Sequence, residues 1–128
     1  MSAEPTTREY PATDDTVLAA TSQDINEVRI SGSVMDYPKI IQTPAGHRVA
    51  TFRVTTLRSF NQNGHRREQF ESHFVAVWDK LVHLVQDLRP GNRVSVLGGL
   101  HTYTWMERRT GVKQSRSEIV GENVIHHH

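Results

Sequence analysis

A chain of 128 residues, 36% hydrophobic and 23% charged, has room for one globular domain and little more. It contains no cysteine, which excludes disulfides, thiolate metal sites and cysteine nucleophiles. No apolar run approaches the roughly 20 residues of a membrane-spanning helix, and residues 1–15 lack the basic patch and apolar stretch of a secretory signal. We therefore expect an intracellular protein with no membrane partner.

Charge is divided unevenly along the chain. Residues 1–25 hold five acidic residues against one arginine, a net charge of −4, and lack sustained periodicity. Residues 26–128 hold 14 lysines and arginines against 9 acidic residues, a net charge of +5. We interpret residues 1–25 as a flexible acidic arm, residues 26–125 as the folded domain, and His126–His128 as the remnant of a purification tag. A mildly basic domain suits a phosphate backbone, although many solvated surfaces have the same sign.

Five stretches have the pattern of β-strands, with alternating or continuous apolar, β-branched and aromatic residues. They are Asn26–Val34, His47–Leu57, Phe70–Trp78, Arg93–Met106 and Val112–Ile125. In the fourth stretch, Gly98 and Gly99 predict a bulge or a sharp bend at a barrel corner.

Turn signals separate these strands. Thr43–Gly46 predicts the first turn, Asn61–Gly64 predicts a hairpin, and Arg108–Gly111 turns the chain into the last strand. Basic residues flank the last two turns, so both hairpins are expected to carry positive charge.

A short helix is predicted between the third and fourth strands. Asp79 stands at the N-cap position, Pro90-Gly91 ends the pattern, and the apolar residues between them fall at i, i+3, i+4 and i+7, namely Leu81, Leu84, Val85 and Leu88. The order is three strands, an α-helix and two strands. This order predicts an all-β fold, the five-stranded Greek-key barrel of the oligonucleotide/oligosaccharide-binding (OB) fold.

Short motifs in this order resemble the bacterial and mitochondrial single-stranded-DNA-binding protein family over residues 26–125. Asn26–Gly32 is similar to its first strand, and Thr43–Gly46 with Val49–Phe52 to its first turn and second strand. Glu71–Leu81 is similar to the third strand entering the helix, and Leu88–Val94 with Gly98–Leu100 to the helix exit and fourth strand. Each motif is weak alone, and their order and spacing make the combination specific.

The resemblance implies a DNA-binding surface built from exposed aromatic residues, at Phe60, Trp78 and Trp105. Stacking suits a binder of any sequence, because every base has a π-face. A further tryptophan that the family often carries is replaced here by Ser72, and neighbouring aromatic residues are candidates to compensate for it. The full set of expected DNA-binding residues is Phe60, Trp78, Trp105, Phe74 and Tyr103, together with the cations Arg58, Arg66, Arg67, Arg108, Arg109 and Lys113.

The resemblance also implies self-association as a homotetramer, a dimer of dimers. Strand Asn26–Val34 is the expected dimer edge, since pairing two exposed strands removes an unpaired edge from each. Val28, Ile30 and His73 are the expected interface residues. Single-stranded DNA could then wrap around several barrels, which raises the effective concentration of weak contacts.

The expected function is sequence-tolerant binding and protection of single-stranded DNA in replication, recombination and repair, without catalysis, cofactor or metal. Replication and repair proteins are further candidate partners. The expected location is the bacterial cytoplasm and nucleoid, or the mitochondrial matrix of a eukaryote.

Three alternatives stay open. A primosomal or scaffold-type OB protein would act mainly through protein partners, and a cold-shock-like module would bind RNA. The candidate aromatic residues could instead be core residues, with Trp78 anchoring the helix beside it, and the arginines could only solubilise the hairpins.

Overall fold

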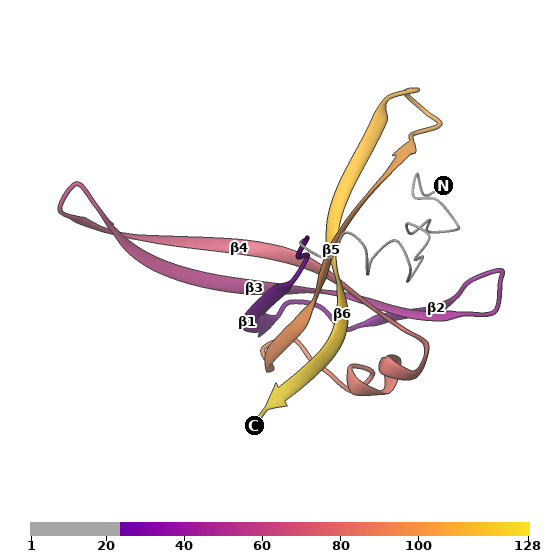
Figure 1. Cartoon of the computed structure of the whole chain (residues 1–128), viewed down its shortest axis with the longest axis horizontal. Coiled ribbons are helices and arrows are strands. Elements are labelled where there is room, and N and C mark those ends of the chain that lie inside the picture. Colours follow the sequence, from indigo (N-terminus) through magenta and orange to yellow (C-terminus); the bar gives the residue numbers. More distant parts are fainter. Residues whose placement is uncertain (1–23) are drawn as a thin grey trace.

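The computed structural model describes residues 24–128, which form six strands and one short helix (Figure 1). The elements are β1 (Val28–Val34), β2 (Lys39–Gln42), β3 (Arg48–Gln62), β4 (His65–Trp78), η1 (Asp79–Leu84), β5 (Arg93–Met106) and β6 (Lys113–His127). Most of the predicted acidic arm lies outside the described residues. Within them, no helix is long and apolar enough to cross a membrane.

Five of the strands close into a barrel. Their order is β1-β5-β6-β4-β3, and β1 closes the ring by pairing with β3 at Ser33–Thr55 and Val34–Val54. All neighbours are antiparallel except β4 and β6, which run parallel where Val75 faces Ile119. The predicted OB barrel is confirmed, with the helix between its third and fourth strands.

The barrel interior consists mainly of valine. Val54, Val77, Val82, Val94 and Val96 are fully buried in one cluster with Phe52 and Ile119. β-branched side chains suit this position, because they pack well on a pleated surface. The closed core fixes β3, β4, β5 and β6, whose ends project as two hairpins (Figure 1).

The helix differs from the prediction in type and in its cap. It is a six-residue 3-10 helix, whereas the sequence pattern predicted an α-helix. Of its residues only Val82 is fully buried, and an i→i+3 hydrogen bond from the Val85 N–H to the Val82 carbonyl, at 3.0 Å, closes its C-terminal end.

The prediction that Asp79 is the N-cap of the helix is also wrong. Trp78 occupies that position, with no side-chain hydrogen bond to the helix, and Asp79 has a φ of 52°. The Asp79 carboxylate instead accepts a hydrogen bond from the Arg48 N–H at 3.2 Å and lies 3.2 Å from His47 Nδ1. Asp79 therefore ties the end of β4 back to the start of β3.

The β3–β4 hairpin is longer than the sequence pattern indicated. Asn63 and Gly64 both have positive φ, at 52° and 79°, as a two-residue type I′ turn requires. The ladder therefore continues to the Gln62–His65 pair next to the turn. The sequence pattern did not predict the short strand β2. Within residues 24–128 it pairs only with β3, and all four of its residues are exposed.

The predicted bulge lies at Gly98. The β5–β6 register shifts there, because Leu97 faces Asn123 while Gly98 faces Gly121, so the extra residue is Glu122 on β6. A Cβ at Gly98 would lie 2.0 Å from the Val120 carbonyl oxygen, which only glycine avoids. Strand β6 then continues to His127, beyond the predicted domain end at residue 125.

Candidate nucleic-acid interface

The strand register separates the two faces of β4. Val75 and Val77 point into the core, so Phe74 and Trp78, on alternate positions, point to the outer face. Phe74 is 38% exposed and faces Arg53 across the β3–β4 pair, while Trp78 is half-buried opposite Val49. Phe74 therefore presents its ring to solvent, and Trp78 is partly covered where η1 begins.

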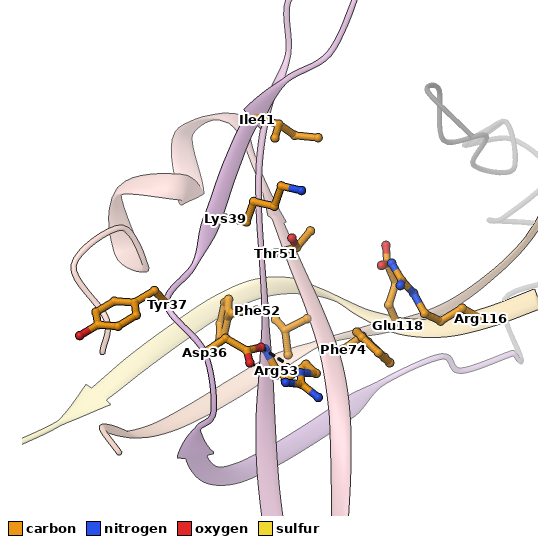
Figure 2. Close-up of a pocket in the computed structure, with 11 residues that line it drawn as sticks. Asp36, Tyr37, Lys39, Ile41, Thr51, Phe52, Arg53, Phe74, Arg116 and Glu118 are labelled. Carbon is orange, nitrogen blue, oxygen red and sulfur yellow. Dashed lines mark hydrogen bonds and ion pairs between the residues drawn. The ribbon is translucent and has the colours of Figure 1, made fainter. Parts of the chain in front are cut away.

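A groove of about 360 Å³ runs over this outer face (Figure 2). It is bounded by the segment after β1, by β2, by the outer faces of β3 and β4, and by β6. Its lining residues are Asp36, Tyr37, Lys39, Ile41, Thr51, Phe52, Arg53, Phe74, Val75, Arg116 and Glu118. The groove thus combines aromatic rings with three cations and two carboxylates.

One ion pair occupies the wall of the groove. Asp36 accepts hydrogen bonds from Arg53 Nε at 2.9 Å and Nη2 at 2.7 Å, and from the Arg53 backbone N–H at 3.1 Å. The side-chain hydrogen bonds from Arg53 hold the pKa of Asp36 below its ordinary value. Burial opposes this effect, and the charge and the backbone N–H of Arg53 add to the lowering. The same hydrogen bonds raise the pKa of Arg53.

A second set of planar side chains follows β5. The rings of His101 and Tyr103 are stacked with centroids 5.9 Å apart, and the Tyr103 and Trp105 rings lie 5.8 Å apart. Tyr103 is only 7% exposed and Trp105 is half-buried. The predicted shared face of Tyr103 and Trp105 is therefore present, and Trp105 is its more accessible member.

Arg116 joins the β5 aromatic residues to Phe74. Its Nη2 donates a hydrogen bond to the Tyr103 hydroxyl at 2.7 Å. Its guanidinium carbon lies 4.4 Å from the centroid of Phe74 and 5.6 Å from that of Tyr103, distances typical of cation–π contacts. The sequence reading did not single out Arg116. The signal for it in the sequence was the alternation of Arg116 and Glu118 in the last predicted strand. In the structure these residues face Tyr103 and His101 across the β5–β6 pair.

The β3–β4 hairpin carries the predicted basic tip. Phe60 is 36% exposed and faces Arg67 directly across the pair, and the Arg58 guanidinium lies 5.4 Å from its ring centroid. Arg66 faces Asn61, so its side chain lies on the other face of the ribbon. Phe60, Arg58 and Arg67 thus form one cluster, well along the hairpin from Phe74.

The second basic cluster lies at the β5–β6 turn. Arg108 and Arg109 are exposed within the turn, and Lys113 opens β6 opposite Met106. The turn is closed by hydrogen bonds from the Glu107 N–H to the Val112 carbonyl at 3.0 Å and from the Gly111 N–H to the Glu107 carbonyl at 2.8 Å. The two predicted cationic clusters therefore occupy two different hairpins, as expected.

The expected interface residues have a mixed placement. Val28 and Ile30 pack against the core but are only partly buried, so part of each side chain stays open to a partner. His73 is half-buried, and its Nε2 lies 2.9 Å from the Thr56 hydroxyl. Between residues 24 and 128, no three His, Asp or Glu side chains gather as metal ligands would.

The family model described as the single-strand binding protein family matches residues 25–126. The chain belongs to this family. Its members are single-stranded DNA-binding proteins. The matched range agrees with the barrel bounds, and residues 1–24 fall outside it.

Relatives of known name and structure agree with this assignment. Single-stranded DNA-binding protein 1 of Chlorobaculum tepidum is 32% identical over 98 residues, which cover 75% of this chain and 60% of that protein. The chain thus spans about 60% of the length of that curated relative. A Plasmodium falciparum SSB, solved in complex with ssDNA, matches with a TM-score of 0.73 at 26% identity over 83% of this chain and 97% of that one.

A third match concerns the fold alone. A deletion mutant of the single-stranded DNA binding protein from Thermus aquaticus has a TM-score of 0.72 at 23% identity. The match covers 81% of this chain and 51% of that one. The single-strand binding family barrel is thus preserved at low sequence identity.

Proposed function

We propose that this protein binds single-stranded DNA without regard to sequence and protects it during replication, recombination and repair. The observation that carries the proposal is the set of aromatic side chains on an OB barrel of this family, flanked by two cationic hairpins. Phe60, Phe74 and Trp105 supply planar surfaces that accept any base. The arginines of both hairpins supply charge for the phosphates.

The proposal places no chemistry on the strand. Binding by stacking and charge needs no nucleophile, cofactor or metal, and the protein acts by occupying the strand. We place it with DNA in a bacterial cytoplasm and nucleoid, in keeping with its bacterial relative, or in a mitochondrial matrix. Replication and repair proteins are proposed as secondary partners.

We also propose a homotetramer formed as a dimer of dimers. One edge of strand β1 pairs with β5 from Val28 to Ser33. The other edge pairs with β3 only at Ser33 and Val34, so on that side Val28–Gly32 has no strand partner among the described residues. A second copy could pair along this edge. Sedimentation analysis should give four times the chain mass, and a monomer at micromolar concentration would refute this arrangement.

Binding of labelled oligo-dT, followed by fluorescence anisotropy, tests the main proposal. Phe60→Ala and Trp105→Ala should each weaken binding by about 1 to 3 kcal/mol, the cost of losing one base stack. Arg89→Ala, at an exposed arginine after η1, is the matched control and should bind like the parent protein.

Duplex DNA of the same length serves as competitor. The proposal requires that duplex compete poorly, because stacked and paired bases cannot reach the aromatic surface. Weak binding of oligo-dT, unchanged by both aromatic substitutions, would instead favour the scaffold-type alternative that acts through protein partners.

A further inference from the structure

A continuous row of planar groups crosses three strands of the barrel. It runs from Trp105 and Tyr103 on β5, through the Arg116 guanidinium on β6, to the Phe74 ring on β4, with successive separations of 5.8, 5.6 and 4.4 Å. Because each member contacts the next, the row joins the aromatic face of β5 to the groove on the outer face of β3 and β4.

Strand divergence explains why Arg116 can bridge this gap. The parallel β4–β6 pairing is limited to Val75–Ile119 and Ala76–Val120, and the residues preceding these pairs separate. Arg116 and Phe74 lie just before the paired region, on strands that Figure 1 shows moving apart. The Arg116 side chain spans the opening, and its hydrogen bond to the Tyr103 hydroxyl fixes the guanidinium plane.

The opening leads directly into the groove. Phe74 and Arg116 both line it and lie next to each other in the close-up, while Lys39 projects from β2 on the far wall (Figure 2). A volume of about 360 Å³ falls at the lower end of the range for sites that hold a small ligand. Asp36 and Arg53 offset each other's charge. The other charged residues that line the groove are two cations, Lys39 and Arg116, and one carboxylate, Glu118.

We propose that Phe74 and Arg116 form a nucleotide subsite, in which one base of the bound strand stacks on this pair and Lys39 contacts the adjacent phosphate. The inference rests on the proposed single-strand binding and adds residues to the surface that the bound strand would follow. A guanidinium plane is itself a surface on which bases stack, and Arg116 is held flat before any ligand arrives. The strand then passes from Trp105 across β6 into the groove.

Lysine substitution separates the planar role of Arg116 from its charge. Arg116→Lys keeps the positive charge but loses the plane and the directed hydrogen bond to Tyr103. It should weaken oligo-dT binding by about 5- to 150-fold, the loss of one stack, at an unchanged salt dependence. Phe74→Leu should cause a loss of the same order, and Arg89→Lys should cause none.

Photo-crosslinking locates the base directly. Oligo-dT carrying 5-iodo-deoxyuridine, irradiated in complex with the unaltered protein, should crosslink to Phe74, as localised by tandem mass spectrometry, and Arg116→Lys should reduce that product selectively. Thermal unfolding of each variant monitors folding, so the parent crosslink decides the question even if a variant is unstable.

The outcomes distinguish this inference from the proposed function. Crosslinks confined to Phe60 and Trp105, with parent-like affinity for Arg116→Lys, would overturn the subsite while single-strand binding stands. Failure of the parent protein to bind oligo-dT would overturn the proposed function itself.

Discussion

Arg53 and Asp36 are joined by two side-chain hydrogen bonds and one from the Arg53 backbone N–H, all between 2.7 and 3.1 Å. The pair fastens the segment after β1 onto the outer face of β3. Since Arg53 faces Phe74 across the β3–β4 ladder, this contact also fixes the wall of the groove beside the proposed base-stacking ring.

Asp36→Asn should lower stability in a pH-dependent way. The pKa of Asp36 is lowered in the folded state. The ionised carboxylate therefore contributes fully to stability above the ordinary aspartate pKa of about 3.9. This contribution is lost as the pH falls through the lower pKa of the folded state. Urea unfolding of both proteins should show a small constant difference from pH 5 to pH 8 that shrinks below about pH 4. The side chains are partly exposed, so solvent screening keeps the effect small. A difference that grows on acidification would contradict this account.

Two adjacent glycines should respond differently to alanine. A Cβ at Gly98 would meet the Val120 carbonyl oxygen at 2.0 Å, whereas one at Gly99 would meet the Asn26 carbonyl oxygen at 3.4 Å, an ordinary contact. Gly98→Ala should therefore destabilise the barrel by about 1 to 3 kcal/mol or more, as overpacking does, and Gly99→Ala should cost much less. Urea unfolding with equal m-values measures both. Equal losses would show that the β5–β6 bulge does not depend on glycine at residue 98.

The cationic hairpins should control the salt dependence of binding. Two double variants test this, Arg66→Ala with Arg67→Ala and Arg108→Ala with Arg109→Ala. Each should reduce the slope of log K against log salt concentration by about 0.7 for every phosphate of a single strand that it no longer neutralises. Anisotropy titrations over a range of salt concentrations give the slopes, with Arg89→Ala as control. Slopes that match the parent protein would mean that these arginines only solubilise the hairpins.

Much of the barrel could be predicted from local pattern. Strand β5 has the bounds that its residues indicated, because apolar periodicity and the Pro90-Gly91 stop act locally. The helix type could not be read in this way. The apolar residues from Leu81 to Leu88 fit an α-helical period, whereas the 3-10 helix ends at Leu84 and buries Val82, which that pattern did not include.

The surface placement of a candidate residue was predictable where its neighbours in the sequence indicate a hairpin or a strand end. Phe60, Trp105 and the hairpin arginines fall into this class. Arg116 and Arg53 do not, because their roles come from contacts with Phe74 and Asp36, which are distant in the sequence and meet only when the barrel closes. Strand β2 escaped prediction because it is four residues long and exposed throughout.

Intrinsic tryptophan fluorescence during titration with oligo-dT tests the central claim most directly. The chain has two tryptophans, Trp78 and Trp105, both among the candidate DNA-binding residues. Strong quenching that saturates at a fixed number of nucleotides per protein, and persists in excess duplex DNA, is the predicted result. Unchanged emission, or quenching abolished equally by duplex, would contradict single-strand binding by base stacking.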